Sequence, residues 1–459
     1  MGSMSEHDWA LDGLRVIVIG AGFGGLASAI ALSKRGASVT VYESYPDMTK
    51  QGDVIMMGSN ATVLLKRWGN VLPEIMKASS LPSHMNLITK EGKLILAQKL
   101  PSEFHGNPNV YTARGGAQAV FYEYAKSLGV DVVFGARVSE IYETADAAGI
   151  VANGVKHEAD CIVAADGVHS KARGFVTGIP DRPKKSGFAV YRSWFPMSRL
   201  LENPLTKPLA ESENPIFKIW ISEDIHAICT TNPSLQRATC FVTHKANVKE
   251  DWNLPGNIDD MRRCVEGWDP QLLAAVNCIP EDCLIDYKLL WRDPVRKWIS
   301  DGGRIALVGD AAHPHLPTSG TGGSQAIEDG TTIAVLLART WANRDIPLAF
   351  RAFERLRYER TSLTQRMGWE TRHVWHQTDW EAVAKNPELL SLPQPEWLNG
   401  CDAEKYAEDK FDAVISHLQK GTPFESTNVP PGHVHEDWTI DQMLAFEGKK
   451  VDKDFYKTR

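Results

Sequence analysis

The pattern of hydrophobic and polar residues predicts a βαβ unit near the start of the chain. Val16-Ile17-Val18-Ile19 is an uninterrupted apolar run, as is typical of a buried parallel strand. A helical pattern over 26–35 and a strand-like run over 38–42 follow it. A strand, a helix and a strand in this order indicate an α/β sheet.

Similar patterns continue to the end of the chain. The predicted helices cover 61–69, 117–128, 258–276 and much of 325–385. The predicted strands lie within 83–113 and at 130–134, 160–165, 188–195, 216–222, 225–231, 238–244 and 304–308. Because short β-rich runs dominate from about 175 to 295, we expect a sheet-based domain inserted into the α/β domain. The segment after 394 is rich in Pro, Asp, Glu and Lys, and we expect it to wrap the surface.

Three glycines follow the first strand at the spacing G-x-G-x-x-G. They are Gly20, Gly22 and Gly25, with Ala21 inside the motif. Glycine lets the chain turn tightly and lets its backbone approach a pyrophosphate at the start of the next helix. Glu43 ends the second strand, where an acid accepts hydrogen bonds from a ribose 2′-hydroxyl. A glycine-rich turn without a ligand is the alternative, and the position of Glu43 favours dinucleotide binding.

Composition and charge exclude several classes of function. A net charge of −7 and a pI near 6.1 argue against nucleic acid or anionic lipid as a partner. Neither a membrane span nor a signal peptide is evident, and the seven cysteines are scattered without a C-x-x-C motif. We therefore expect a cytoplasmic protein without a zinc site or a redox disulfide. His313 and His315 stand in a proline-bracketed turn without further ligands nearby, so we expect no metal site.

Two further motifs identify a family when they are combined with the glycines. They are Ala164-Ala165-Asp166-Gly167 and Gly309-Asp310-Ala311-Ala312-His313-Pro314. In this order and spacing, the three motifs resemble the single-component FAD-dependent aromatic monooxygenases, of the salicylate- and para-hydroxybenzoate-hydroxylase type. The resemblance covers roughly residues 14–370. It implies FAD as cofactor, NADPH or NADH as a transient reductant, and oxygen transfer from a flavin C4a-hydroperoxide.

The resemblance also implies roles for individual residues. Asp310 would bind the ribityl hydroxyls, Pro317 would lie beside the reactive ring carbon, and Val54 belongs to a segment beside the flavin ring. The remaining residues implied to contact the cofactors are Arg114, Asp166, Gly322 and Gly323. Asp329 also matches a family position, although an acid on a helix surface is an equal alternative.

Arg192 and Asp47 are the catalytic candidates. Arg192 interrupts an otherwise apolar predicted strand in Tyr191-Arg192-Ser193-Trp194, and a charge there needs a partner. In the resembled family the matching strand faces the flavin. Asp47 lies in the loop between Glu43 and the Gly52-Asp53-Val54 segment, and we expect it to pair with Arg192. An edge-strand arginine and a solvated turn aspartate are the alternatives.

The predicted fold is α/β: a Rossmann-like FAD-binding domain with an inserted mixed β-sheet substrate domain and a helical C-terminal region. The expected boundaries are 12–175 and 296–390 for the FAD domain, 176–295 for the substrate domain and 391–459 for the tail.

The predicted function is hydroxylation or epoxidation of an electron-rich aromatic in secondary metabolism. The Tyr191–Trp194 motif resembles indole-alkaloid epoxidases or spirocyclases of the paraherquamide type. Two alternatives are a flavin halogenase or dehydrogenase, and a binding protein like the GDP-dissociation inhibitors and Rab escort proteins. The oligomeric state is not indicated.

Overall fold

A parallel sheet of five strands organises the first part of the computed structural model, which describes residues 10–48, 53–179, 183–245 and 253–445. Gly52 and residues 446–459 of the predicted tail lie outside this description. The strand order is β10 (Asp131–Val133), β2 (Ser38–Tyr42), β1 (Arg15–Ile19), β14 (Cys161–Ala164) and β22 (Ile305–Leu307). The chain moves from β1 to β2 on one side and later adds β14 on the other. Ligands bind at such a switch point, beyond the carboxyl ends of the strands.

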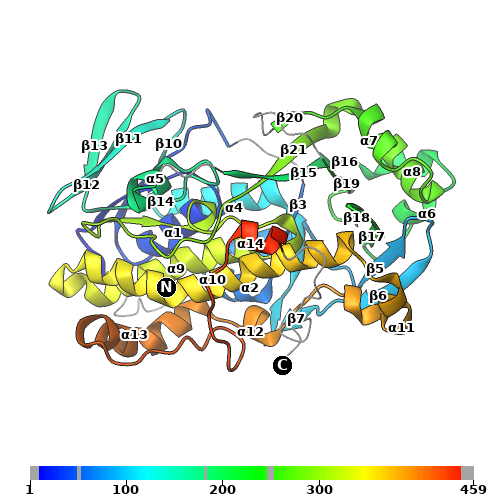
Figure 1. The fold of residues 1–459 in the computed structure, drawn as a ribbon. Coiled ribbons are helices and arrows are strands. Elements are labelled where there is room, and N and C mark those ends of the chain that lie inside the picture. Colours follow the sequence, from blue (N-terminus) through cyan, green and yellow to red (C-terminus); the bar gives the residue numbers. More distant parts are fainter. Residues whose placement is uncertain (1–9, 49–52, 180–182, 246–252, 446–459) are drawn as a thin grey trace.

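Helices pack on this sheet and on one another. They include α1 (Phe23–Ser33), α4 (Arg114–Ser127), α9 (Gly322–Thr340), α10 (Ile346–His376) and α13 (Ala403–Lys420). In Figure 1, α9 and α10 run across the molecule and α13 lies below α9. Helices α1 and α9 touch at Gly330, where a Cβ atom would lie 2.5 Å from the Ser28 nitrogen. Ala403, Ala407 and Val414 of α13 are core residues, so the tail contributes to the core as well as to the surface.

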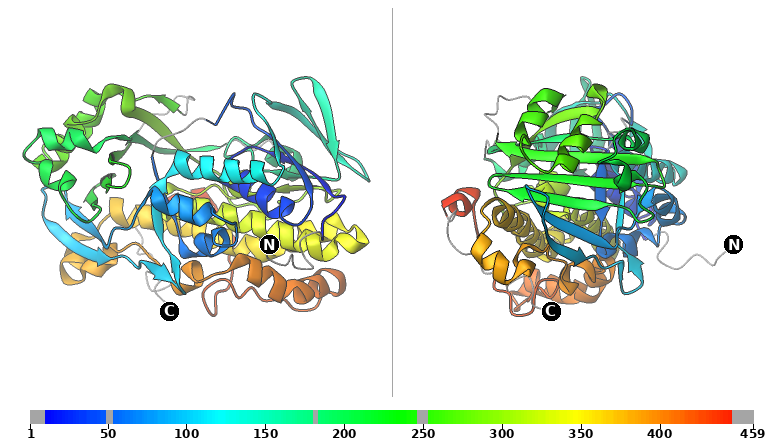
Figure 2. Two further views of the ribbon diagram at one scale, coloured as in Figure 1. Left: turned by 180° about the vertical axis from the view of Figure 1, so that it is seen from behind. Right: turned by 90° about the vertical axis from the view of Figure 1, so that its right-hand side faces the viewer.

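A second, mixed sheet forms the other half of the molecule. Its strands run in the order β20 (Asn253–Pro255), β21 (Leu284–Trp291), β15 (Lys184–Ser193), β19 (Arg237–Lys245), β18 (Ile225–Asn232), β17 (Phe217–Ser222), β5 (His84–Thr89) and β6 (Leu94–Lys99), with β16 (Phe195–Pro196) beside β19. Strand β17 is parallel to β5, and the other pairs are antiparallel. In the right-hand view of Figure 2, the green strands of this sheet run lengthwise across the picture. Strands β5 and β6 come from within residues 12–175, so this part of the expected FAD domain joins the second sheet.

The two faces of the second sheet have different partners. Ala227, Cys229, Cys240 and Val242 belong to the core cluster that also holds residues of α7 (Ile258–Cys264) and α8 (Pro270–Asn277). Side chains alternate along a strand, so the residues between these point to the opposite face. The predicted helix 258–276 is divided into α7 and α8, because Gly267 adopts φ of +76° and Pro270 starts a new helix.

Smaller elements complete the fold. The sheet of β11 (Val138–Glu143), β12 (Ala148–Ala152) and β13 (Val155–Ala159) was not expected from the sequence pattern. The other strands are β3 (Val54–Met57), β4 (Ser79–Ser80), β7 (Glu103–Phe104), β8 (Asn107–Pro108) and β9 (Val110–Ala113). The other helices are α2 (Ser59–Leu65), α3 (Val71–Lys77), α5 (Lys171–Thr177), α6 (Lys207–Ala210), α11 (Trp380–Lys385), α12 (Glu396–Asn399) and α14 (Ile440–Ala445).

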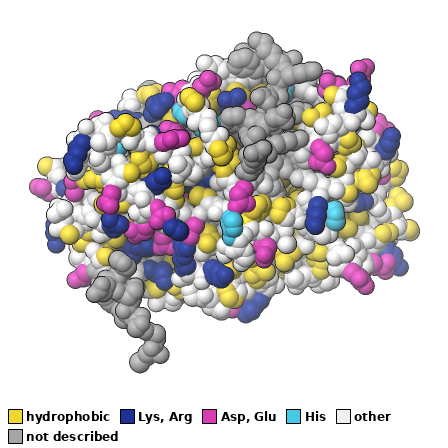
Figure 3. Space-filling model, turned by 90° about the horizontal axis from the view of Figure 1, so that it is seen from below, with side chains coloured by type: hydrophobic (Ala, Val, Ile, Leu, Met, Phe, Trp, Pro, Cys, Tyr) yellow, Lys and Arg dark blue, Asp and Glu magenta, His cyan; other side chains and the backbone are white. Residues whose placement is uncertain are grey.

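The surface carries charges of both signs. On the face seen from below, Lys and Arg side chains are interspersed with Asp and Glu side chains (Figure 3). Among the described helices, none has the length and hydropathy that crossing a membrane requires.

Candidate active site

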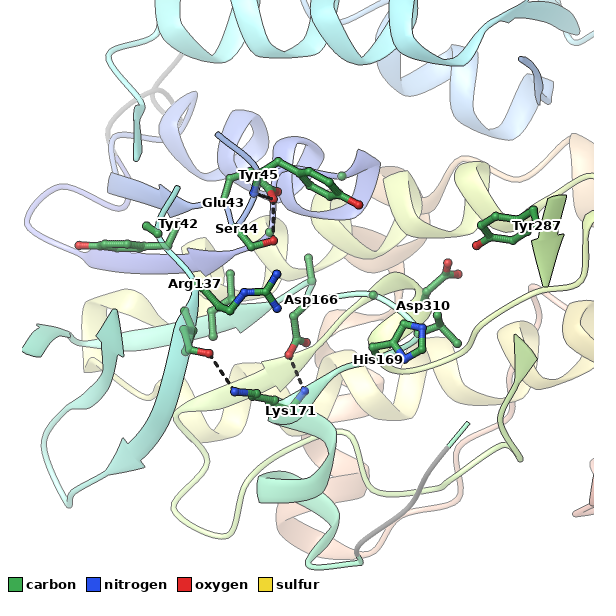
Figure 4. Close-up of a pocket in the computed structure, with 18 residues that line it drawn as sticks. Tyr42, Glu43, Ser44, Tyr45, Arg137, Asp166, His169, Lys171, Tyr287 and Asp310 are labelled. Atoms are coloured by element: carbon green, nitrogen blue, oxygen red, sulfur yellow. Dashed lines mark hydrogen bonds between the residues drawn. The ribbon is translucent and has the colours of Figure 1, made fainter. Parts of the chain in front are cut away.

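An open cavity of about 510 Å³ lies at the carboxyl edge of the parallel sheet. Figure 4 shows the segment Tyr42–Tyr45 on one side of it and Asp310 and Tyr287 toward the other end, with Asp166 between them. Gly20, Gly22, Glu43, Asp166 and Asp310 line it, which brings five of the predicted cofactor residues together. Its position matches the switch point between β1 and β14.

The three motif glycines serve two purposes. A Cβ atom at Gly20 would lie 2.5 Å from the Ala165 oxygen, and one at Gly25 would lie 1.9 Å from the Gly20 oxygen. These two glycines are therefore needed for packing between strand, turn and helix. A Cβ atom at Gly22 would meet no described atom within 4 Å. Gly22 lies at the N-cap of α1 and leaves open the space that a phosphate group needs beside the helix N-terminus.

Glu43 stabilises the backbone at one end of the cavity through hydrogen bonds. Its Oε2 atom accepts a hydrogen bond from the Ala21 nitrogen at 2.7 Å, and its Oε1 atom accepts one from the Tyr45 nitrogen at 2.8 Å. A carboxylate has about four acceptor positions, so Glu43 retains capacity for a ribose. Gln118 donates a hydrogen bond to the Ala21 oxygen at 2.8 Å and fastens the same turn to α4.

Asp166 lines the first cavity and caps the start of α5. Its Oδ2 atom accepts hydrogen bonds from the backbone nitrogens of Lys171 and Ala172, at 2.8 and 3.1 Å, at the start of α5. Its Oδ1 atom is buried and has no hydrogen-bond partner among the described residues. Burial raises the pKa of this carboxyl.

A buried ionic cluster supports the loop that carries Asp310. Asp329 accepts hydrogen bonds from the Gly309 nitrogen at 2.9 Å, from His313 at 2.6 Å and from Arg357 at 2.8 Å. Burial opposes ionisation of Asp329, but the charges of His313 and Arg357 outweigh it and hold the pKa below its ordinary value. Asp329 is therefore a buried residue that fixes the backbone next to Asp310, not an acid on the helix surface.

A second, apolar chamber of about 170 Å³ lies between the mixed sheet and the turn before α9. The described residues that line it include Val54, Met56, Met85, Tyr111, Val190, Phe217, Ile219, His226, Ile228, Thr230, Phe241, Thr243, Leu289, Leu316, Pro317, Thr318, Gly320, Arg372, Trp375 and Leu392. The turn is held to α10 by a hydrogen bond from Thr318 to the Gly368 oxygen at 2.6 Å. Trp220, one of the tryptophans that could have lined such a pocket, lies instead in the core on the other face of the sheet.

The predicted residues Gly322 and Gly323 have a packing role at the start of α9. A Cβ atom at Gly323 would lie 2.8 Å from Cδ1 of Ile55, and one at Gly322 would lie 3.1 Å from Cβ of His315. Both glycines thus allow the first turn of α9 to approach the segments that surround the chamber. His315 itself is hydrogen-bonded to Thr364 of α10 at 2.8 Å.

Arg192 lies where the two cavities meet. Its guanidinium is 5.1 Å from the ring of Tyr287, which lines the first cavity, and 6.0 Å from the ring of Phe241, which lines the second. It forms an ion pair with Asp53, whose side chain is 2% exposed. Arg114 donates from Nε to the same carboxylate at 3.0 Å. Asp53 thus holds two arginines, one from each part of the fold.

The sequence analysis expected Asp47 to be the carboxylate partner of Arg192. In the structure, Arg192 forms an ion pair with Asp53. Asp47 has an exposed side chain in the loop that leads to residues 49–52, which lie outside the described residues. The sequence analysis chose Asp47 because it lies in the loop between Glu43 and the Gly52-Asp53-Val54 segment. Asp53 directly precedes β3, and its carboxylate lies beside Arg192.

Sequence reasoning also missed two residues in the wall of the first cavity. Arg137 follows β10, the neighbour of the strand that ends at Glu43, and lies between Glu43 and Asp166 (Figure 4). The carboxyl ends of adjacent parallel strands meet, so its position was available as a signal. Tyr287 comes from β21 of the other sheet, and burial raises the pKa of its hydroxyl. No local sequence pattern indicates that a residue so distant in the chain lines this cavity.

The comparisons with known proteins agree with this geometry. A family model described as "FAD binding domain" matches residues 13–346. Asperlicin C monooxygenase of Petromyces alliaceus is 33% identical over 431 residues, which are 91% of this chain and 94% of that protein. The crystal structure of CtdE in complex with FAD and substrate 4 is 30% identical, with a TM-score of 0.83, and the match covers 89% of this chain and 100% of that one. A salicylate hydroxylase substrate complex, 23% identical with a TM-score of 0.72 over 86% of this chain and 97% of that one, shares the fold.

Proposed function

This chain belongs to the FAD binding domain family and is an FAD-dependent monooxygenase, and on that premise we propose its substrate class and the roles of its residues. NAD(P)H is the reductant typical of this family. A halogenase, a dehydrogenase or an escort-like binding protein is not favoured, because a relative that matches nearly the whole chain is named as a monooxygenase.

The first cavity is proposed to hold FAD. Its pyrophosphate would lie against Gly20, Gly22 and the N-terminus of α1, its ribose at Glu43 and its ribityl chain at Asp310. When bound, FAD supplies the redox chemistry, because it accepts electrons from NAD(P)H and activates O2 for transfer of one oxygen atom. The open space at Gly22 supports this assignment.

The substrate is proposed to be an electron-rich aromatic, such as an indole alkaloid, that is hydroxylated or epoxidised. The observation that carries this proposal is the apolar chamber, which reaches Pro317 and Gly320 just before α9. Aromatic side chains from separate elements line it, among them Tyr111, Phe217 and Trp375. A dry, apolar chamber excludes water from the reacting groups and favours a flat aromatic over a polar substrate.

Arg192 and Asp47 are proposed to act in catalysis. Arg192 lies at the meeting point of the cavities, where its donors can orient a substrate or stabilise developing negative charge. Asp53 supports the arginine by fixing its guanidinium. Asp47 would approach from the loop before β3, and substitution of this residue with asparagine tests it separately from Asp53.

The decisive experiment supplies labelled O2 and NAD(P)H to the purified yellow protein with a panel of indoles. We expect consumption of NAD(P)H to rise with a suitable indole and one labelled oxygen to appear in its product. Product that carries no label would exclude monooxygenation and favour a dehydrogenase. A cytoplasmic location is part of the proposal, and the seven free cysteines support it because a reducing compartment keeps thiols unpaired.

A further inference from the structure

Three hydrogen-bonded side chains form a chain at the wall of the apolar chamber. Thr243 of β19 and His226 of β18 both line the chamber and stand opposite each other in the sheet. The Nε2 atom of His226 lies 3.1 Å from Oγ1 of Thr243, and its Nδ1 atom lies 2.7 Å from Nε2 of His376 at the end of α10. Each of the three residues is at most 4% exposed, so water does not compete for these hydrogen bonds.

Both imidazole rings are neutral at physiological pH. Burial lowers the pKa of His226 to about 3 and that of His376 well below its ordinary value. A neutral imidazole carries one proton, so one of its nitrogens donates and the other accepts. Because the two rings are bonded to each other, the donor in that bond fixes the proton on both rings. The chain therefore has only two possible directions.

The second nitrogen of His376 decides between them. This Nδ1 atom is buried and has no hydrogen-bond partner among the described residues. If His226 donated to His376, Nδ1 of His376 would be a buried N–H group without an acceptor, which is rare in folded proteins. If His376 donates instead, its Nδ1 atom is an acceptor without a donor, which is tolerated more often. The favoured direction thus runs from His376 to His226, and from Nε2 of His226 to Oγ1 of Thr243.

This direction leaves the hydroxyl proton of Thr243 available. Within the part of the chain that the structure describes, His226 is the only hydrogen-bond partner of this hydroxyl, and Oγ1 accepts in that bond. A buried donor is unfavourable until it finds an acceptor. Because Thr243 lines the chamber, a molecule bound there can supply one.

We infer that Thr243 donates a hydrogen bond to a carbonyl oxygen of the substrate, and that His226 and His376 are positioning residues that keep the hydroxyl in the donating direction. This inference rests on the proposed function, because it takes the chamber as the substrate site. A substrate with a carbonyl at this place should be preferred over an analogue with a methylene group, since the analogue leaves the hydroxyl proton buried and unpaired.

Two pairs of indoles test the preference, and the members of each pair differ in a carbonyl group. The short pair is 3-acetylindole and 3-ethylindole, and the long pair is N-acetyltryptamine and 3-pentylindole. Calorimetric titration of the FAD-loaded protein without NAD(P)H measures binding alone. In at least one pair, we expect the carbonyl compound to bind about 5- to 10-fold more tightly, as one buried hydrogen bond predicts. The pair that responds indicates how far the hydroxyl lies from the bound ring.

Three variants assign the preference to the hydroxyl of Thr243. Thr243→Val removes the hydroxyl and keeps the branched shape, so the two members of the responding pair should bind equally. Thr243→Ser should keep most of the preference. The matched control is Thr239→Val on the same strand, because the Thr239 hydroxyl is also buried but has no hydrogen-bond partner and lies outside the chamber wall described here. This control should bind all four probes as the wild type does.

Two spectroscopic measurements report the hydrogen bonds themselves. The carbonyl stretching frequency of an isotopically labelled probe should be lower when it is bound to the wild type than when it is bound to Thr243→Val. Nuclear magnetic resonance of protein labelled at its histidine ring nitrogens, assigned with His226→Gln, should place the proton of His226 on Nε2. A proton on Nδ1 would mean that the chain runs in the opposite direction.

The outcomes separate this contact from the reaction. Equal affinities within both pairs, failure of all four probes to bind the wild type, a preference that survives in Thr243→Val, or a proton on Nδ1 of His226 would overturn the inference. If Thr243→Val does not fold, Thr243→Ser, the wild-type comparison of probes and the position of the proton still decide. A carbonyl preference that depends on Thr243, without labelled oxygen in any product, would contradict the proposed function and leave this inference standing.

Discussion

Arg192 is the residue whose surroundings bear most directly on catalysis. A guanidinium on an apolar strand is stable only with a partner, and Asp53 supplies one at a place where Tyr287 and Phe241 exclude water. Loss of one preorganised donor costs about 10²–10³ in rate. We therefore expect Arg192→Ala to retain FAD and to lose labelled product by about that factor. The control is Arg199→Ala, since Arg199 is paired with Glu202 on the surface of the same domain. Equal product from both variants would return Arg192 to a structural role.

The fingerprint glycines allow a second test at single residues. In Gly22→Ala the added Cβ atom meets open space, and φ of −72° suits alanine. We expect this variant to fold with wild-type stability and to bind FAD at least 10-fold more weakly, because the methyl group occupies the phosphate position. In Gly25→Ala the methyl group meets the Gly20 oxygen, so thermal unfolding of the apoprotein should shift strongly downward. Matching FAD affinity in Gly22→Ala and the wild type would contradict the assigned phosphate site.

The sequence predicted the site residues whose positions follow directly from the order of strands in the parallel sheet. Gly20, Gly22, Glu43, Asp166 and Asp310 follow or end strands of that sheet, so their convergence could be inferred from strand order alone. Asp53 and Tyr287 required the path of a loop and the approach of a second sheet. Neither leaves a periodic signal in the sequence.

Among the elements, α9 and α10 are joined by four buried charges. Glu328 accepts two hydrogen bonds from Arg360 at 2.8 Å and one from Arg357, and Asp329 accepts from Arg357. All four side chains are at most 2% exposed. The sequence predicted the helices, whereas the charged residues inside them were indistinguishable from a solvated face until the two helices were placed together.

Breaking this cluster should destabilise the protein strongly. Glu328→Gln leaves the two arginines with one buried carboxylate, and such an unbalanced buried charge costs about 3–5 kcal/mol. The exposed pair Lys405–Asp409 on α13 provides the control, because Asp409→Asn should cost less than about 1 kcal/mol. Urea unfolding of the FAD-loaded proteins measures both. Similar midpoints for the two variants would show that the cluster does not hold the helices together.

At the scale of the whole molecule, the change from helical to β-rich patterns predicted the two-part architecture. It did not predict which sheet each strand joins. Strands β5 and β6 were expected as strands, yet the pairing of β5 with β17 joins segments more than 100 residues apart in the sequence, as the pairing of Leu87 with Ile219 shows. The order of strands within such a mixed sheet depends on which faces must be covered. A single sequence indicates which face of a strand is apolar, but it does not indicate which strands lie beside it.

Buried histidines predict how the stability of the whole molecule depends on pH. Burial lowers the pKa of His226 and of His315 to about 3 and that of His376 well below its ordinary value. The unfolded chain binds protons on these rings below about pH 6.5 and the folded chain does not, so stability falls as pH falls from 6.5 toward 3. Each histidine contributes a slope of about 1.4 kcal/mol per pH unit once the pH is well below 6.5. Burial raises the pKa of Asp166, so protonation of this carboxyl favours the folded protein as pH falls. Because the wild-type stability curve sums these opposing effects, variants are needed to isolate the contribution of one histidine.

Urea unfolding between pH 5 and pH 8 should therefore show a shallower acid slope in His226→Gln than in the wild type. The expected difference is about one proton, or roughly 1.4 kcal/mol per pH unit near pH 5. His84→Gln is the matched control, because His84 is exposed on β5, and its slope should equal that of the wild type. The comparison is between slopes, so the hydrogen bonds that His226 loses to Thr243 and His376 do not affect it if their loss is independent of pH. An unchanged slope in His226→Gln would mean that this ring takes up its proton in the folded protein.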